Sequence, residues 1–199
     1  MTLATFFATY VKFFFILTPF FITSVFIALT EDEPKTVRHQ LAGRITLSVA
    51  IISLVLLWAG KTIFDTLSIT VDAFRIGAGA LLFRSALSLV EGTIQVPNAK
   101  GKLIDLAVVP LSIPMTLGPG SVGALVLMSS ETESLATKGL TSLAILLSIF
   151  TLGILLYLSA HLVQWVGRNG ISMLSKITGL VLSALSSQMI FTGVAHFLK

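Results

Sequence analysis

Cysteine is absent from the 199 residues, which excludes disulfides, thiol catalysis and cysteine-ligated metal sites. Charged residues make up only 11% of the chain, whereas a soluble domain carries roughly 25%. Hydrophobic residues make up 55%. A soluble chain of this length must still cover its surface with polar groups. The composition therefore predicts a membrane protein whose surface mostly faces lipid.

Motifs for catalysis, metals and nucleic acids are also missing. His39, His161 and His196 do not have the spacing of metal ligands, and there is no phosphate-binding loop. The segment around Ser121 fails the G-x-S-x-G pattern because Pro119 stands at its first position. The lysines and arginines form no basic run that would bind nucleic acid. We therefore expect no enzyme activity, no bound cofactor or metal, and no nucleic-acid partner.

Long apolar stretches are abundant, and the lipid bilayer is the partner they predict. A helix needs about 20 mostly apolar residues to cross a hydrocarbon core about 30 Å thick. The stretches lack the period-two alternation of barrel strands and exceed barrel-strand length. The prediction is an all-α membrane protein in one integral membrane domain, residues 1–199. Six stretches are long enough: Phe6–Leu29, Ala42–Phe64, Ala73–Val90, Asp105–Met128, Leu140–Val163 and Leu174–Phe197.

Basic residues near the span ends predict the orientation, since they favour the cytoplasmic side. Six spans put both termini on one side of the membrane. The loops on the opposite side hold Lys35, Arg38, Arg44, Lys100, Lys102, Arg168 and Lys176. The terminal side holds Lys61, Arg75, Lys138 and Lys199. This asymmetry predicts a multi-pass inner-membrane protein with periplasmic termini.

An offset of about 100 residues aligns the sequence with itself. Thr18-Pro19 then matches Gly118-Pro119, and the stretch 29–33 matches 129–133. The same offset aligns the first span with the fourth and the third span with the sixth. We therefore expect a duplication.

The predicted duplication comprises repeat one at about 1–95 and repeat two at about 103–199. A unit of three spans must enter the membrane from opposite sides in its two copies, which gives an inverted repeat. Inverted repeats are typical of secondary transporters that work by alternating access.

The fourth predicted span contains several helix breakers. Pro110, Pro114 and Pro119 each remove a backbone donor, and Gly118 and Gly120 lie beside the last of them. An interruption in the membrane must face protein or a wet cavity. One interpretation is two half-helices that meet at the midplane as a substrate site. The alternative is a proline kink with close packing through small residues.

A substrate site at this interruption would suit a carboxylate. Free N–H groups at a half-helix N-terminus around Gly120 and Ser121 attract negative charge. Thr18-Pro19 marks a milder interruption in the first span, and helices 1 and 4 are therefore both predicted to be discontinuous. Neutral hydrogen bonds could come from Thr18, Thr23, Thr116 and Ser121.

Three polar residues lie near or within the spans, and a structural role explains each of them at least as well as a functional one. Gln188 lies midway along the sixth span, where its amide could contact substrate or tie two helices together. Arg75 and Lys176 open corresponding spans in the two repeats, and both are interpreted as snorkelling anchors.

With these residues in view, the chain resembles the MarC family of bacterial inner-membrane proteins. The resemblance runs nearly end to end. Its most specific piece is Val108–Pro114 followed by Gly118–Gly120, which is similar to the family's V-P-L-A-x-P…A-G-P-G segment. Phe74–Gly79 and Lys176–Leu180 add two shorter matches. The chain departs from the family by having Thr18 in place of asparagine before proline.

The resemblance implies a secondary transporter of small neutral amino acids, such as glycine or alanine, coupled to protons or sodium ions. The expected ligand is a zwitterionic amino acid. Alternatives left open are an exporter or channel for another solute and a non-transporting assembly protein, and homo-oligomerisation is also open. The predicted substrate site comprises Thr18, Pro19, Thr23, Thr116, Gly118, Pro119, Gly120, Ser121 and Gln188.

Overall fold

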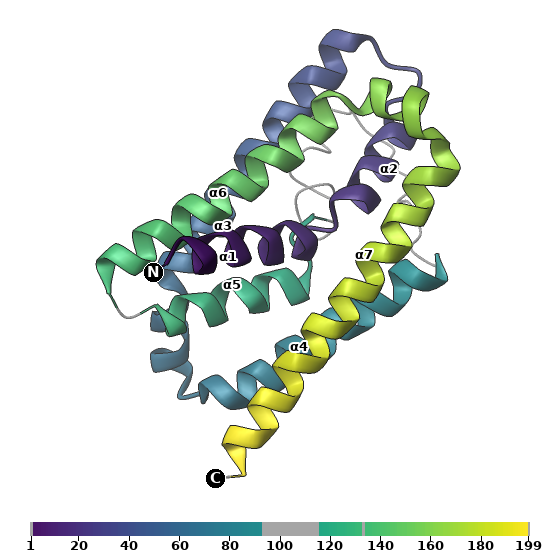
Figure 1. Ribbon diagram of the computed structural model, residues 1–199. Helices are drawn as coiled ribbons and strands as arrows, with labels where there is room; N and C mark the ends of the chain where they lie inside the picture. Colours follow the sequence, from purple (N-terminus) through teal and green to yellow (C-terminus); the bar gives the residue numbers. More distant parts are fainter. Residues whose placement is uncertain (1, 93–115, 133, 199) are drawn as a thin grey trace.

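The computed structural model describes residues 2–92, 116–132 and 134–198, and these residues form helices without any strand. This confirms the all-α prediction. The helices in chain order are α1 Leu3–Ile16, α2 Pro19–Leu29, α3 Lys35–Leu67, α4 Val71–Glu91, α5 Pro119–Glu131, α6 Leu135–Tyr157 and α7 Ser159–Phe197 (Figure 1).

Five stretches of the described residues are long and apolar enough to cross a membrane. They are Leu3–Leu29, Lys35–Gly60, Val71–Glu91, Leu135–Tyr157 and Asn169–Phe197. Each overlaps one of the predicted spans. The predicted fourth span, Asp105–Met128, begins outside the described residues, and α5 alone has 13 residues. The described part thus supports five of the six predicted spans.

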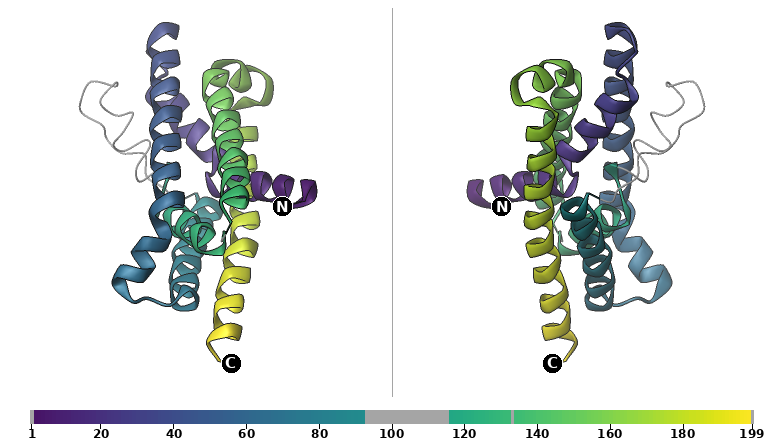
Figure 2. Two further views of the ribbon diagram at one scale, coloured as in Figure 1. Left: turned by 90° about the vertical axis from the view of Figure 1, so that its left-hand side faces the viewer. Right: turned by 90° about the vertical axis from the view of Figure 1, so that its right-hand side faces the viewer.

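The first span is broken, as the Thr18-Pro19 pair predicts. α1 ends at Ile16 and α2 begins at Pro19. Thr18 between them adopts φ 50° and ψ 53°, a left-handed conformation that disfavours a non-glycine residue and cannot continue a right-handed helix. As a result α1 projects from the side of the bundle, while α2 turns along it (Figure 2).

The most extensive helix packing is between α4 and α7, which run antiparallel. Glycines of α7 lie at this contact. A Cβ atom on Gly179 would lie 2.9 Å from the carbonyl oxygen of Ala86. A Cβ atom on Gly193 would lie 2.9 Å from the carbonyl oxygen of Asp72. Because any side chain at these positions would meet backbone, the glycines permit the close approach of the two helices, as small residues do in membrane bundles.

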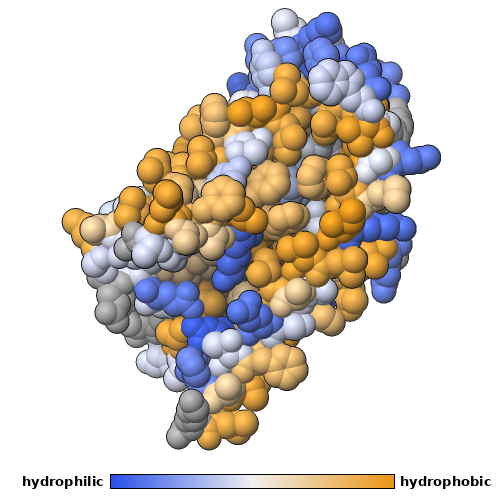
Figure 3. Space-filling view, viewed as in Figure 1, coloured by the Kyte–Doolittle hydropathy of each residue, from blue (hydrophilic) through white to orange (hydrophobic). Residues whose placement is uncertain are grey.

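Apolar side chains cover much of the outside as well as the core. Phe13, Leu17 and Phe26 are fully buried where α1 and α2 enter the bundle. Phe150 on α6 and Phe191 on α7 are by contrast largely exposed. Orange, apolar atoms extend over most of the face in Figure 3. Such a surface would be insoluble in water and matches a lipid environment.

The boundary between the last two predicted spans is wrong by several residues. The sequence predicts a fifth span to Val163, but α6 ends at Tyr157 and α7 begins at Ser159. A second departure from helical geometry lies at Gly167, with φ 73° and ψ 162°, which glycine adopts without a Cβ clash. Apolar residues continue across the turn, so hydropathy alone does not locate it.

Candidate functional site

The break in the first span contacts the described part of the predicted interruption in the fourth span; Pro110 and Pro114 lie outside the described residues. The Ser121 hydroxyl, in the first turn of α5, donates to the carbonyl oxygen of Ile16, the last residue of α1, at 3.2 Å. The Ser121 side chain is buried. The end of α1 and the start of α5 meet near the middle of the molecule (Figure 1). Residues 105 positions apart in sequence thus bring both interruptions to one place.

Both half-helices that follow the interruptions begin at a proline. α2 starts at Pro19 and α5 at Pro119, and neither N-cap residue, Thr18 or Gly118, makes a side-chain cap hydrogen bond. The first-turn N–H groups of a helix have no partner within the helix, and they carry partial positive charge. Neither the N-terminus of α2 nor that of α5 thus has a side-chain cap from its N-cap residue, and the α5 N-terminus around Gly120 and Ser121 is the one that the sequence predicts as a carboxylate site.

The threonines of the predicted site are buried or half-buried. The Thr23 hydroxyl is fully buried and donates to the carbonyl oxygen of Pro19 at 2.7 Å. Thr116 is also buried, one turn before α5. Thr18 is half-buried at the break itself. The hydroxyls of Thr23 and Ser121 both already donate to backbone carbonyls, so a ligand would have to compete for them.

The glycine-proline segment packs partly against α4 instead of facing an open site. A Cβ atom on Gly120 would lie 2.8 Å from the Cα of Leu82. Pro119 is exposed and lines a mostly apolar cleft of about 760 Å³ between α4 and α5. Gly120 therefore permits helix packing, and a bulky substitution there would test packing before it tested ligand binding.

Gln188 does not share the buried environment of the other candidates. Its side chain lies on an exposed face of α7, whereas Ser186 and Met189 on the same helix are buried. The hypothesis of a buried amide at this position is wrong. In a helix, adjacent residues are separated by about 100°, so a mid-span position alone does not specify which face a side chain occupies.

A charged cluster that the sequence interpretation missed joins three helix ends. Arg75 donates to Asp72 at 2.9 Å on α4 and to Glu131 at 2.6 Å at the end of α5. His196 near the end of α7 lies 3.4 Å from the Asp72 carboxylate. The Arg75 side chain is only 11% exposed. Arg75 is thus a bridging residue, and its interpretation as a snorkelling anchor is wrong.

One signal in the sequence could have indicated this cluster. Asp72 and Arg75 are three residues apart, a spacing that brings opposite charges together on a helix. The pairing with Glu131 depends on how α5 packs against α4. Spacing along the chain does not reveal that contact.

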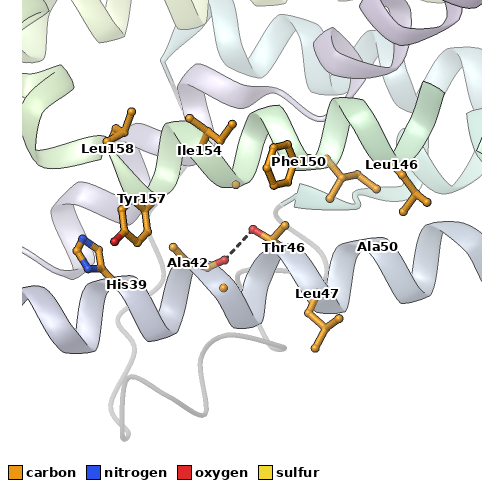
Figure 4. A pocket seen from close by; sticks show the side chains of 13 residues that line it. His39, Ala42, Thr46, Leu47, Ala50, Leu146, Phe150, Ile154, Tyr157 and Leu158 are labelled. Carbon is orange, nitrogen blue, oxygen red and sulfur yellow. Dashed lines mark hydrogen bonds between the residues drawn. The ribbon is translucent and has the colours of Figure 1, made fainter. Parts of the chain in front are cut away.

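A second large cleft, between α3 and α6, is mostly apolar. It has a volume of about 730 Å³, and its polar groups are few (Figure 4). The rings of His39 and Tyr157 stack at one end with centroids 3.8 Å apart. The Thr46 hydroxyl inside donates to the carbonyl oxygen of Ala42. This surface suits acyl chains better than it suits a zwitterion, so we do not place the substrate site here.

Comparison with known proteins identifies the family. Residues 3–198 match the model of the MarC family integral membrane proteins. The UPF0056 membrane protein MJ1677 of Methanocaldococcus jannaschii is 33% identical over 200 residues, which cover 98% of each chain. The UPF0056 membrane protein YhcE of Escherichia coli K12 is 30% identical over 94% of this chain and 93% of its own length. No solved structure matches the chain. The chain therefore belongs to the MarC family of integral membrane proteins.

Proposed function

We propose that the protein is a secondary transporter that moves small neutral amino acids across the bacterial inner membrane by alternating access. The observation that carries this proposal is the hydrogen bond from Ser121 to Ile16, which joins the two helix interruptions. Two uncapped half-helix N-termini at the same place offer backbone N–H groups to a substrate carboxylate. Protons or sodium ions would drive the cycle.

The arrangement of the half-helices supports an inverted repeat of residues 1–95 and 103–199. α2 and α5 begin 100 residues apart at Pro19 and Pro119. α2 packs against α7 in the other repeat, and α5 packs correspondingly against α4. Two similar halves that exchange conformations would open the central site to each side in turn. In this proposal six spans cross the membrane and both termini are periplasmic.

Substrate binding would require the buried hydroxyls to change partners. Ser121 and Thr23 donate to backbone carbonyls, so in this proposal both hydroxyls are engaged before the substrate binds. When the substrate carboxylate replaces the Ile16 carbonyl as the acceptor for Ser121, the end of α1 is released from α5. A ligand shifts a conformational equilibrium when it binds one state more tightly. This exchange would couple binding to movement of the half-helices.

Uptake into proteoliposomes tests the proposed function. We expect saturable uptake of labelled glycine and alanine, and accumulation when either a pH or a sodium gradient is imposed. The gradient that drives accumulation identifies the coupling ion. Uptake that neither saturates nor accumulates would indicate a channel. Correctly inserted protein without any uptake of either amino acid would contradict the proposal and favour another solute or an assembly role.

Ser121→Ala tests the site within this function. The variant loses the hydroxyl that we assign to the substrate carboxylate, and we expect the rate of uptake at low alanine concentration to fall roughly tenfold, as for about 1.4 kcal/mol of lost hydrogen bonding. Ser130→Ala is the matched control, because Ser130 lies on the same helix and donates only to the carbonyl oxygen of Leu127. Equal uptake by the two variants would remove Ser121 from the site.

A further inference from the structure

A small polar cavity lies away from the helix interruptions, where α2, the end of α4 and α7 meet. Its volume is about 180 Å³. The residues lining it are Phe21, Ser24, Val25, Ser88, Leu89, Gly92, Ser172, Ser175 and Lys176. The described lining residues include a lysine and four serines and no acidic side chain. Its chemistry therefore differs from that of the two larger apolar clefts.

Three hydrogen-bond donors in this cavity have no partner among the described residues; Ser24 is half-buried, and Ser172 and Lys176 are exposed. Ser24 and Ser172 have hydroxyls without a hydrogen bond to any described residue, and Lys176 has no ion pair within the same part of the chain. The other two serines are engaged, since Ser88 donates to Arg84 and Ser175 to Ile171 through their backbone carbonyls. One ammonium and two free hydroxyls would complement an acceptor-only group such as a carboxylate.

The position of Lys176 strengthens this conclusion. Lys176 lies within the apolar stretch Asn169–Phe197 of α7, which is long enough to cross a membrane. A charged side chain within a span is costly and usually pairs with another group or lies at a water-filled cavity. A bound anion would supply the pairing that the described residues do not.

The opposite wall of the cavity is suited to positive charge. α4 ends at Glu91, with Gly92 as its left-handed C-cap, and Leu89 and Gly92 line the cavity. The last carbonyl groups of a helix lack partners within it and carry partial negative charge. Donors on α2 and α7 thus face acceptors at the end of α4. An amino-acid zwitterion carries one charged group for each wall.

We infer that Lys176, Ser24 and Ser172 form a binding site for the carboxylate of a small solute, between the central interruptions and the membrane surface. The inference rests on the proposed function for the identity of that solute, an amino acid on its way to or from the central site. Phe21 and Ser24 lie on α2, within two turns of Thr18 at the interruption. The cavity is therefore a vestibule to the central site.

Thermal unfolding of the purified protein tests this site without requiring transport. Propionate, which is alanine without its amino group, serves as the probe, with n-propylamine and sodium chloride at equal ionic strength as controls. A ligand that binds only the folded state raises the unfolding midpoint. We expect propionate at about fifty times its dissociation constant to raise the midpoint by roughly 5 °C in wild-type protein and in Lys176→Arg. Lys176→Gln and Ser24→Ala should show little or no shift.

The comparison separates a small carboxylate from a lipid headgroup. An equal propionate shift in wild-type protein and Lys176→Gln would overturn the inference, as would the absence of a shift in wild-type protein. Stabilisation by short-chain phosphatidylglycerol alone would also overturn it, in favour of a lipid site. Lys12→Gln controls for the loss of a lysine elsewhere, on α1. Because this readout does not measure uptake, the vestibule and the transport function can fail independently.

Discussion

Replacing Gly79 with valine should destabilise the protein by about 3 kcal/mol, because the side chain would be forced into α7. A Cβ atom at this position would lie 2.8 Å from Cγ1 of Ile190 and 3.1 Å from the carbonyl oxygen of Ser186. Ile190 could rotate away, but the backbone of α7 could not without moving the helix. For a chain of this length the midpoint of thermal unfolding should fall by roughly 6–12 °C.

Gly77→Val is the matched control on the same helix. No atom lies within 4 Å of a Cβ at Gly77, and this residue borders the open cleft beside α5. Both substitutions add the same β-branched side chain to a helix interior, so their helix propensities cancel. The midpoint of Gly77→Val should stay within about 2 °C of wild type. Equal loss in the two variants would show that α4 and α7 are not packed through Gly79.

The contrast between these glycines shows what the sequence can and cannot reveal about the fold. Hydropathy correctly predicts five membrane-long helices among the described residues, because lipid requires long apolar helical segments. Proline correctly predicts the interruption before Pro19, because it removes a backbone donor at a fixed position. Composition gives no means of distinguishing Gly77 from Gly79. That difference depends on which face of α4 packs against α7. Both the packed face and the lipid-facing face of a membrane helix are apolar, so the sequence does not distinguish them.

The candidate site was predictable to a similar extent. α2 and α5 begin at Pro19 and Pro119, two residues that the 100-residue offset aligns. The offset does not predict that Ser121 bonds to Ile16 in the other half of the chain, because this contact depends on the angle at which α1 leaves the break. The prediction that Gln188 belongs to the site rests on its position midway along the sixth span, but its side chain lies on an exposed face of α7. Position along a span thus predicts depth, while the facing direction depends on tertiary packing.

Arg75→Gln should have the second largest effect, a loss of about 2 kcal/mol in the free energy of unfolding. Removing the guanidinium leaves the Asp72 and Glu131 carboxylates without the cation that binds both. Breaking a fully buried pair costs roughly 3–5 kcal/mol, and exposed pairs contribute 1 kcal/mol or less. Arg75 is 11% exposed but Glu131 is 47% exposed, which places this cluster between the two limits.

A double-mutant cycle measured by thermal or denaturant unfolding isolates the Arg75–Glu131 pair. Glu131→Gln should cost about 1 kcal/mol, and the double variant should lose about 1 kcal/mol less than the sum of the single losses, because it also removes one of the two unpaired carboxylates. Arg44→Gln is the control, since Arg44 is exposed on α3 and forms no ion pair with a described residue. Strict additivity would show that the two side chains do not interact. In that case the ends of α4 and α5 are held by packing alone, and the charged cluster does not close this end of the bundle.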